Sequence, residues 1–315
     1  MGAIIVTGAA GFIGSHLCER LLELGHRVIG FDNFDDFYDP AIKRDNLSEC
    51  LSNKSFSMHE GDIRDADAVA KLFSGDIEAV VHLAARAGVR PSIVEPQRCQ
   101  DVNVGGTTVM IEAARNAGCP KFILASSSSV YGNNKKIPFA ESDNVDFPIS
   151  PYAASKKSAE LIAHTYAHLF DMSVTCLRFF TVYGPRQRPD LAIHKFTKLI
   201  ESGEPIPVFG DGSTSRDYTY IDDIIDGVVR SIEKCEGYKI YNLGESQPIR
   251  LDELIAAIEK AVGKKAIINR LPTQPGDVDR TFADVDLAKK ELGYNPSTHI
   301  DEGLAQFVRW FHKRS

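Results

Sequence analysis

The chain opens on a glycine-rich turn that strongly limits the folds available to it. Residues 3–6 form a short apolar run typical of a buried parallel strand, and an apolar-periodic helix follows directly. A strand that turns into a helix in this way directs backbone N–H groups and the positive helix end at one point, where phosphate binds. The spacing therefore predicts a dinucleotide-binding turn. It is formed by Gly8, Gly11, Phe12, Ile13 and Gly14.

An acidic residue follows about twenty positions later, as such a turn requires. Asp32 comes directly after a second predicted strand, 27–31, and Asn33 is next to it. A carboxylate there hydrogen-bonds ribose hydroxyls and repels a 2′-phosphate, which favours NAD over NADP. The alternative for Asp32 is a turn or helix-capping acid. Because ligands bind outside the carboxyl ends of parallel strands, the ends of strands three and four are also predicted to contact the cofactor. These residues are Asp62, Ile63, Leu83, Ala84 and Ala85.

Strand-like and helix-like segments alternate up to about residue 180. Strands are predicted at 3–6, 27–31, 55–59, 78–82, 120–125 and 173–178, and helices at 12–24, 40–52, 65–73, 97–117 and 151–169. This alternation predicts an α/β fold with a doubly wound parallel sheet in a Rossmann domain, 1–180. Residues 181–315 are richer in proline and predict a smaller substrate-binding lobe, with 217–243 returning to the first domain. Its helices are predicted near 192–202, 221–234, 251–262 and 300–312.

Composition excludes several classes of function. Thirty-six basic and 43 acidic residues give a net charge of -7, and no basic block indicates a nucleic-acid surface. The six cysteines lack close pairs, which predicts reduced thiols and no zinc site. No apolar run approaches 18 residues, so we expect a cytoplasmic protein without a membrane span. No metal is expected: His164 and His168 lack the acid of a zinc motif, and Asp222-Asp223 are predicted to cap a helix.

A second constellation carries candidate chemistry. Four serines, 126–129, follow the predicted strand 120–125, and Tyr152 and Lys156 share one face of a helix at i and i+4. A tyrosine has a pKa near 10, and lowering it to about 7 takes roughly 4 kcal/mol. A nearby lysine ammonium and a positive nicotinamide ring favour the phenolate. The spacing thus predicts a tyrosine base, with a serine hydroxyl bonding the reacting oxygen. The alternative for a Tyr-x-x-x-Lys pair is a solvated helix face.

These motifs resemble the extended short-chain dehydrogenase/reductase family, in its nucleotide-sugar branch. The resemblance covers most of the chain. It rests on Thr7-Gly-Ala-Ala-Gly-Phe-Ile-Gly14, His82-Leu-Ala-Ala85, Asn103-Val-Gly-Gly-Thr107, Ser127-x-x-Val-Tyr-Gly132, Tyr152-x-x-x-Lys156 and Arg216-Asp-Tyr-Thr-Tyr-Ile-Asp-Asp223. Within the branch, the UDP-glucuronate 4-epimerases are most similar. The segments that indicate this are Ala87-Gly-Val-Arg90, Arg178-Phe-Phe-Thr-Val-Tyr-Gly-Pro185, Arg188-Pro-Asp190 and Gln274-Pro-Gly-Asp-Val278. UDP-galactose 4-epimerases usually carry Asn where Thr181 stands and Arg where Gln274 stands.

The resemblance implies a redox-neutral cycle on a UDP-sugar. Tyr152 would take the proton of the sugar 4-hydroxyl while hydride passes from C4 to NAD, and a 4-keto sugar would turn over before hydride returns. Lys156 would hold the nicotinamide ribose and lower the Tyr152 pKa. Register within the motif points to Ser127 as the serine at O4, although all four serines stay candidates. Asn103 and Ser126 are expected at the cofactor.

The resemblance also implies where the UDP-sugar binds. Arg216 and Arg280 stand where the family holds the diphosphate or uridine, and guanidinium suits phosphate and carboxylate geometry. Each arginine could instead form a surface salt bridge. Candidates for the sugar carboxylate are Thr181 and Arg188, with Arg90 also considered. The remaining substrate-binding candidates are Ser128 and Ser129 near the sugar, Phe180, and Val208 and Phe209 beside uracil.

Three rival functions stay open at this point. A UDP-glucuronate decarboxylase shares the first oxidation, but such lyases typically carry an acid where Ser128 or Ser129 stands. A UDP-glucose/UDP-galactose 4-epimerase differs in the C5 group of its substrate. A redox-inactive nucleotide sensor should lack the tyrosine or the lysine, and both are present. The resemblance also implies a homodimer formed through helices 97–117 and 151–169, whose apolar faces could equally pack in the core.

Overall fold

The computed structural model describes residues 2–273 and 280–314. Its larger part is a seven-stranded sheet in the order β10-β6-β5-β4-β1-β2-β3, and all its neighbouring strands pair in parallel. The predicted doubly wound parallel sheet is confirmed. The strands are β1 Ala3–Thr7, β2 Arg27–Asp32, β3 Phe56–Glu60, β4 Ile77–His82, β5 Lys121–Ser127, β6 Ser173–Phe179 and β10 Tyr238–Leu243.

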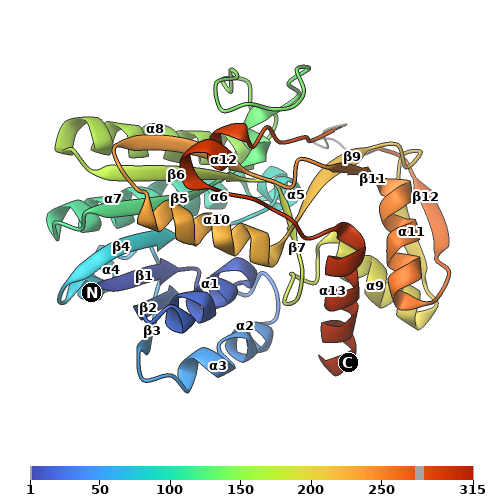
Figure 1. Ribbon diagram of the computed structural model, residues 1–315, viewed down its shortest axis with the longest axis horizontal. Helices are drawn as coiled ribbons and strands as arrows, with labels where there is room; N and C mark the ends of the chain where they lie inside the picture. Colours follow the sequence, from blue (N-terminus) through green and yellow to red (C-terminus); the bar gives the residue numbers. More distant parts are fainter. Residues whose placement is uncertain (1, 274–279, 315) are drawn as a thin grey trace.

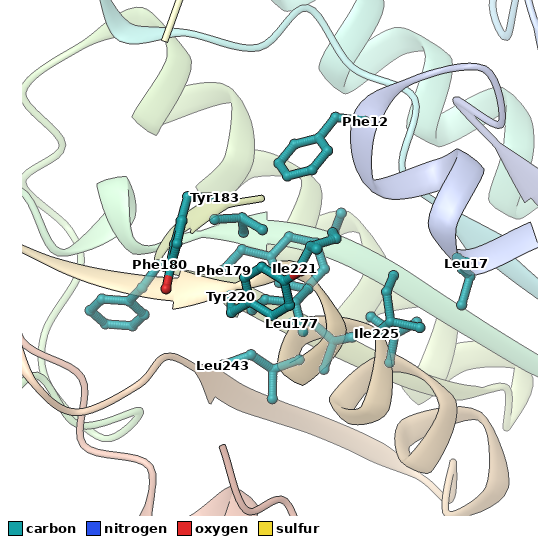
Figure 2. Close-up of a cluster of buried hydrophobic side chains, with 14 of the residues drawn as sticks. Phe12, Leu17, Leu177, Phe179, Phe180, Tyr183, Tyr220, Ile221, Ile225 and Leu243 are labelled. Carbon is teal, nitrogen blue, oxygen red and sulfur yellow. The ribbon is translucent and has the colours of Figure 1, made fainter. Parts of the chain in front are cut away.

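Helices cover both faces of this sheet (Figure 1). Strand β1 shows the reason, because alternate side chains enter different cores: Ile4 and Val6 on one face, Ala3 and Ile5 on the other. The first face packs against α1 and α10, where the cluster drawn in Figure 2 lies. The second packs against α4, α7 and α8. These helices are α1 Phe12–Glu23, α4 Ala66–Ala70, α7 Gly106–Asn116, α8 Pro151–Phe170 and α10 Ile221–Glu233.

Two long helices predicted from the sequence are divided in the structure. The predicted helix 97–117 consists of α6 (Pro96–Gln100), a π-helical turn (Asp101–Gly105) and α7, and the wider turn is where Asn103 lies. The predicted helix 40–52 is divided at Leu47 into α2 (Pro40–Asn46) and α3 (Ser48–Leu51). A short helix, α5 (Val89–Val94), was not predicted, because its six residues are too few to show an apolar period.

The smaller part lies at the right of Figure 1 and combines two small sheets with α9, α11 and α13. The division at residue 180 stays a prediction; β10 and α10, from segment 217–243, lie with the large sheet. The four predicted helices are present, whereas α12 and the five short strands were not predicted. The elements of the smaller part are β7 Thr181–Tyr183, α9 Ala192–Ser202, β8 Pro205–Phe209, β9 Ser215–Tyr220, β11 Pro248–Arg250, α11 Leu251–Val262, β12 Ile267–Leu271 and α13 Ile300–Arg314, whereas α12 Asp286–Leu292 contacts β10 and α10 of the larger part.

Two expectations from the sequence remain, one on the segment 274–278 and one on membrane spans. The segment Gln274 to Val278, one basis of the resemblance, lies outside the described residues. Within 2–273 and 280–314, no helix has the length and apolar character needed to cross a membrane.

Candidate active site

The glycine turn between β1 and α1 leaves no room for side chains. Gly8 has a positive φ of 69°, and a Cβ there would come within 2.9 Å of the backbone nitrogen of Ala84. A Cβ on Gly14 would collide with the carbonyl oxygen of Gly8. The Gly11 N–H donates to that same oxygen at 3.0 Å, which closes the turn. The turn therefore offers a backbone-lined cradle at a helix N-terminus, as a pyrophosphate requires.

Asp32 lies beside this cradle at the end of β2. One carboxylate oxygen accepts from the Ala10 N–H at 3.0 Å, and the other accepts from the Phe34 N–H at 2.8 Å. Burial raises the pKa of Asp32, while these hydrogen bonds act in the opposite direction. Asp32 is thus a turn acid. Each of its carboxylate oxygens also keeps a second lone pair for a further hydrogen bond beside the glycine turn.

The ends of β3 and β4 differ in how they fit the predicted cofactor contacts. Asn33 donates to Asp62 at 3.2 Å, and a bidentate bond from Arg64 lowers the pKa of Asp62 to about 2. At the end of β4, the Ala84 N–H donates to the Thr7 hydroxyl at 3.1 Å. The end of β4 is therefore held close to the glycine turn. The side chains of Ala84 and Ala85 are small, so a cofactor can approach the backbone there.

Three consecutive residues of β5 contact three residues on one face of α8. The Lys156 ammonium donates to the Ala125 carbonyl at 2.8 Å, the Ser126 hydroxyl donates to Glu160 at 2.5 Å, and the Ser127 hydroxyl is near enough to Tyr152 to lower the pKa of its phenol. Tyr152, Lys156 and Glu160 follow one another at i, i+4 and i+8. These contacts favour Ser127 as the serine that shares a site with the tyrosine. The Ser126 hydroxyl donates its hydrogen to Glu160, and the cofactor contact predicted for Ser126 stays a prediction.

The other two serines continue from the strand into a short 3-10 turn, Ser128–Tyr131. The Ser127 hydroxyl accepts from the Ser129 N–H at 3.1 Å and lies 3.1 Å from the Ser129 hydroxyl. Ser128 and Ser129 are half-buried, whereas Ser127 is buried. A sugar oxygen near Tyr152 would therefore meet a cluster of hydroxyl groups.

The electrostatics of Tyr152 differ from the sequence expectation. Burial raises the Tyr152 pKa, and the groups that act against burial are the Ser127 hydrogen bond and the positive charge of Arg188. Lys156 Nζ lies 5.9 Å from the centre of the tyrosine ring, and burial lowers its own pKa to about 8. Arg188 is thus a cation that lowers the Tyr152 pKa and that the sequence did not predict in this role. The lowering expected from Lys156 stays a prediction.

Asn103 serves as a bridge between elements. Its side-chain oxygen accepts from the Arg86 N–H at 2.7 Å, and its amide donates to the Arg86 carbonyl at 3.2 Å and to the Ser155 hydroxyl at 2.9 Å. Ser155 in turn donates to the Tyr152 carbonyl at 2.7 Å. These bonds use both amide hydrogens, so a cofactor acceptor would have to replace one of them, whereas the side-chain oxygen keeps a second lone pair for a donor.

A cation–π link between the loop after β2 and two arginines was not predicted from the sequence. The ring of Phe37, in the loop after β2, lies 4.5 Å from the Arg86 guanidinium and 5.1 Å from that of Arg188. Asp35, two residues earlier, accepts from Arg86 at 2.8 Å and from Arg98 at 2.7 Å. The Phe37 ring thus connects Arg86, next to the predicted cofactor contacts at the end of β4, with the segment that contains Arg188. The members of the link are up to 151 positions apart in the chain, so no local pattern could reveal it.

The substrate-binding candidates fall into two groups. Phe180 is 4% exposed and packs with Tyr131 and Phe139, and Val208 is 1% exposed, so both belong to the core. Figure 2 shows Phe180 within that buried cluster. Both side chains are thus part of the core packing, and the substrate contacts predicted for them stay a prediction. Thr181 and Phe209 are half-buried and stay candidates.

The arginine candidates occupy three positions around the site. The Arg90 guanidinium lies 4.8 Å from the ring of Phe209, so the α5 segment contacts the substrate lobe. Arg188 forms a bidentate pair with Asp190 at 3.0 and 2.8 Å. Arg216 and Arg280 come from neighbouring segments, because Ser215 and Arg280 form a parallel β-bridge. Their convergence on one ligand stays a prediction.

The acids and histidines that could be mistaken for metal ligands have other roles. Asp223 accepts from the N–H groups of Ser297 and Thr298, while α10 begins after Tyr220 without a side-chain cap. The expected capping role of Asp222-Asp223 is therefore wrong. His164 and His168 stack on each other, and the described residues contain no metal-binding group of three such side chains.

With this geometry in place, comparisons with known proteins assign the family. The family model described as GDP-mannose 4,6 dehydratase matches residues 5–307. The chain belongs to this family of extended short-chain dehydrogenases/reductases. It is 44% identical over 312 residues to a UDP-glucuronate 4-epimerase of Thermodesulfobacterium geofontis, covering 98% of this chain and 96% of that one.

Solved structures agree in fold over the full chain. UDP-glucuronic acid 4-epimerase from Bacillus cereus, in complex with UDP-glucuronic acid and NAD, gives a TM-score of 0.95 at 37% identity, covering 99% of this chain and 100% of that one. UDP-glucose 4-epimerase from Thermotoga maritima, with UDP-glucose, gives 0.91 at 34% identity, covering 99% of both chains.

Proposed function

We propose that this protein is an NAD-dependent 4-epimerase that interconverts UDP-glucuronate and UDP-galacturonate. The observation that carries the proposal is the position of the Tyr152 phenol, where the Ser127 hydroxyl at the end of β5 and the positive charge of Arg188 both lower its pKa. That arrangement combines a proton acceptor with an oxygen-binding hydroxyl and a cation suited to a sugar carboxylate. Full-length similarity to UDP-glucuronate 4-epimerases supports the same reaction and places the enzyme among the isomerases.

The residues of the glycine turn fit NAD. Glycine at positions 8 and 14 lets the turn pack tightly against the Ala84 backbone and the Gly8 carbonyl, so that its N–H groups at the start of α1 can receive the pyrophosphate. Asp32 beside the turn suits an adenosine ribose that lacks a 2′-phosphate. The Bacillus cereus enzyme was solved with NAD bound. The chemistry that NAD supplies, when bound, is the reversible uptake of hydride from C4 of the sugar.

The chain's own contribution to the reaction is proton transfer and positioning. The Tyr152 oxygen accepts the proton of the 4-hydroxyl as that oxygen becomes a ketone, and returns it when the sugar is reduced on its other face. Ser127 donates a hydrogen bond to the same sugar oxygen. Since burial alone raises the Tyr152 pKa, the site needs the positive charge of Arg188 to favour the phenolate.

We assign the substrate's carboxylate to Arg188, with Thr181 as a second contact. Arg188 already pairs with a carboxylate, that of Asp190, whose side chain is 44% exposed. A partly exposed pair of this kind contributes little free energy, so a substrate carboxylate could take the place of Asp190. Holding the carboxylate also restrains the 4-keto acid intermediate, which as a β-keto acid could otherwise lose CO2.

A UDP-glucose 4-epimerase is the second candidate, because the Thermotoga maritima enzyme shares the fold. Its substrate has no carboxylate to engage Arg188. The purified protein should therefore turn over UDP-glucuronate in preference to UDP-glucose, with UDP-galacturonate as product and no added NAD. Tyr152→Phe should reduce kcat by about 100- to 10,000-fold. UDP-pentose as the main product would instead indicate a decarboxylase, and unchanged turnover by Tyr152→Phe would contradict the catalytic assignment.

The assembly and location expected from the sequence remain part of this proposal. Leu161 and Leu169 on α8 are 55% and 66% exposed, and Phe170 is 46% exposed, which supports a homodimer through α7 and α8. All six cysteines are free and buried, which fits a reducing compartment such as the cytoplasm. Sedimentation of the protein and of Leu161→Asp tests the dimer; a wild-type monomer would exclude it.

A further inference from the structure

The catalytic helix α8 begins with an N–H group that its own capping residues do not satisfy. Ser150 caps the helix by accepting from the Ala153 N–H at 3.1 Å, and Pro151 has no N–H. The remaining donor of the first turn belongs to Tyr152 itself. It is satisfied from another element, because the Tyr152 N–H donates to the hydroxyl of Ser92 on α5 at 3.0 Å.

The Ser92 hydroxyl is held in one orientation. It donates to the Val89 carbonyl, one turn earlier on α5, at 2.6 Å, so its hydrogen is committed and its lone pair receives the Tyr152 N–H. Ser92 is 1% exposed, which excludes water as a ready replacement. The bond therefore fixes the backbone of the catalytic tyrosine relative to α5.

The same short helix contacts the substrate lobe. Arg90, two residues before Ser92, places its guanidinium 4.8 Å from the ring of Phe209 at the end of β8. The last turn of α5 is followed by Glu95, which pairs with Arg86 and Arg98. In Figure 1, α5 lies between α8 and the strands of the substrate lobe. The path from Phe209 through Arg90 and Ser92 to Tyr152 is thus short and continuous.

We propose that Ser92 is a positioning residue that ties α5, with its Arg90 contact to the substrate lobe, to the backbone of Tyr152. The proposal rests on the proposed epimerase function, in which Tyr152 is the proton acceptor. Loss of the tie lets the first turn of α8 move and takes the Tyr152 phenol away from the Ser127 hydroxyl. That hydroxyl lowers the Tyr152 pKa, so the change acts on chemistry more than on substrate binding.

The test compares Ser92→Ala with a matched control, Ser231→Ala. Ser231 on α10 is 0% exposed and donates to the Val228 carbonyl at 2.7 Å, also one turn earlier, but it contacts none of the site residues named above. We expect Ser92→Ala to lower kcat about 10- to 100-fold with little change in KM, because small displacements of a catalytic group cost that much. Its acid limb in the pH profile of kcat should move to higher pH, and Ser92→Thr should recover part of kcat. Ser231→Ala should match the wild type in kcat, KM and pH profile.

A second readout does not need the epimerase reaction. In hydrogen exchange, the Tyr152 amide should exchange roughly tenfold faster in Ser92→Ala than in Ser231→Ala or the wild type. If Ser92→Ala does not fold, Ser92→Cys, a weaker acceptor of similar size, gives the same comparison. Wild-type kcat, pH profile and amide exchange in the Ser92 variants would overturn the proposal. A wild-type enzyme inactive on UDP-sugars would overturn the proposed function, while the exchange result would still decide whether the tie exists.

Discussion

Two arginine–carboxylate pairs with nearly the same geometry lie in different parts of this molecule. Arg178 and Glu160, behind β5, are joined by two bonds of 2.9 Å, and each side chain is 1% exposed. Arg188 and Asp190, in the substrate lobe, are joined by bonds of 3.0 and 2.8 Å, with 17% and 44% exposed. Burial is the main difference between them. A buried pair must stay intact, whereas a partly exposed pair can exchange its partner.

The surroundings of the buried pair fit a structural role. Glu160 also accepts from Ser126 at 2.5 Å, and Arg178 donates to the Tyr131 hydroxyl at 3.0 Å, which continues to Asn242 at 2.7 Å. The network joins α8 to β5, β6 and β10. Every member is satisfied, so the pair holds the helix that carries Tyr152 in register with the strand that carries Ser127.

The largest effect should follow when the buried pair loses one charge. Glu160→Gln leaves the Arg178 charge buried without a counter-charge, so the free energy of unfolding should fall by about 3–5 kcal/mol, measured by urea denaturation. The control at the other pair, Asp190→Asn, should cost less than about 1 kcal/mol. Equal losses in the two variants would mean that burial does not separate the pairs.

The next effect concerns activity and comes from the exposed pair. Arg188→Gln should leave the free energy of unfolding within about 1 kcal/mol of wild type, while kcat/KM on UDP-glucuronate falls about 10- to 100-fold, the value of a charged hydrogen bond. The acid limb of kcat should also move to higher pH, because Arg188 lowers the Tyr152 pKa and catalysis needs the phenolate. Asp190→Asn should keep most of the activity. An unmoved acid limb would show that Arg188 does not set the phenol's charge.

The comparison also shows which parts of the molecule were readable from the sequence. Local spacing predicted the glycine turn, the strands of the first 180 residues and the helix face shared by Tyr152 and Lys156. Each of these features depends on residues that are near one another in the chain. Ser127 could be favoured from its register in the Ser127-x-x-Val-Tyr-Gly132 motif, although all four serines stayed candidates. The breaks around Asn103 were not visible, because the π-helical turn lies beside tertiary bonds to Arg86 and Ser155.

Charged residues were the least readable from the sequence. Arg178 entered the sequence comparison only as part of a motif, yet it is one of the largest fully buried side chains. Its partner Glu160 lies 18 positions earlier, on a different element, so no spacing rule links them. Phe180, two residues after Arg178 in the same motif, was assigned to the substrate but packs in the core, because a motif gives position in the chain and not the direction of a side chain.

Glu245 is a third carboxylate, and it is partly buried without a bond from any arginine that the structure describes. Its replacement should have the smallest of the predicted effects. One oxygen of Glu245 is buried without a hydrogen-bond partner among the described residues, and burial, with the nearby charges of Asp223 and Asp217, raises its pKa to about 7. The folded pKa is above the ordinary value of 4.5, so the stabilising contribution is complete below about pH 4.5 and is lost as pH rises through 7.

Glu245→Gln should therefore make the protein more stable than wild type at pH 8.5, by about 1–2 kcal/mol after allowance for solvent screening, and nearly equal to it at pH 5. Urea denaturation at the two pH values measures the difference. Glu236→Gln removes the same charge at an exposed position and should show no such pH dependence. If both variants respond alike, net charge explains the effect. A stabilisation seen only for Glu245→Gln, and only at high pH, would show that the ionised, half-buried Glu245 lowers the free energy of unfolding. Asp190 avoids such a loss because it pairs with Arg188.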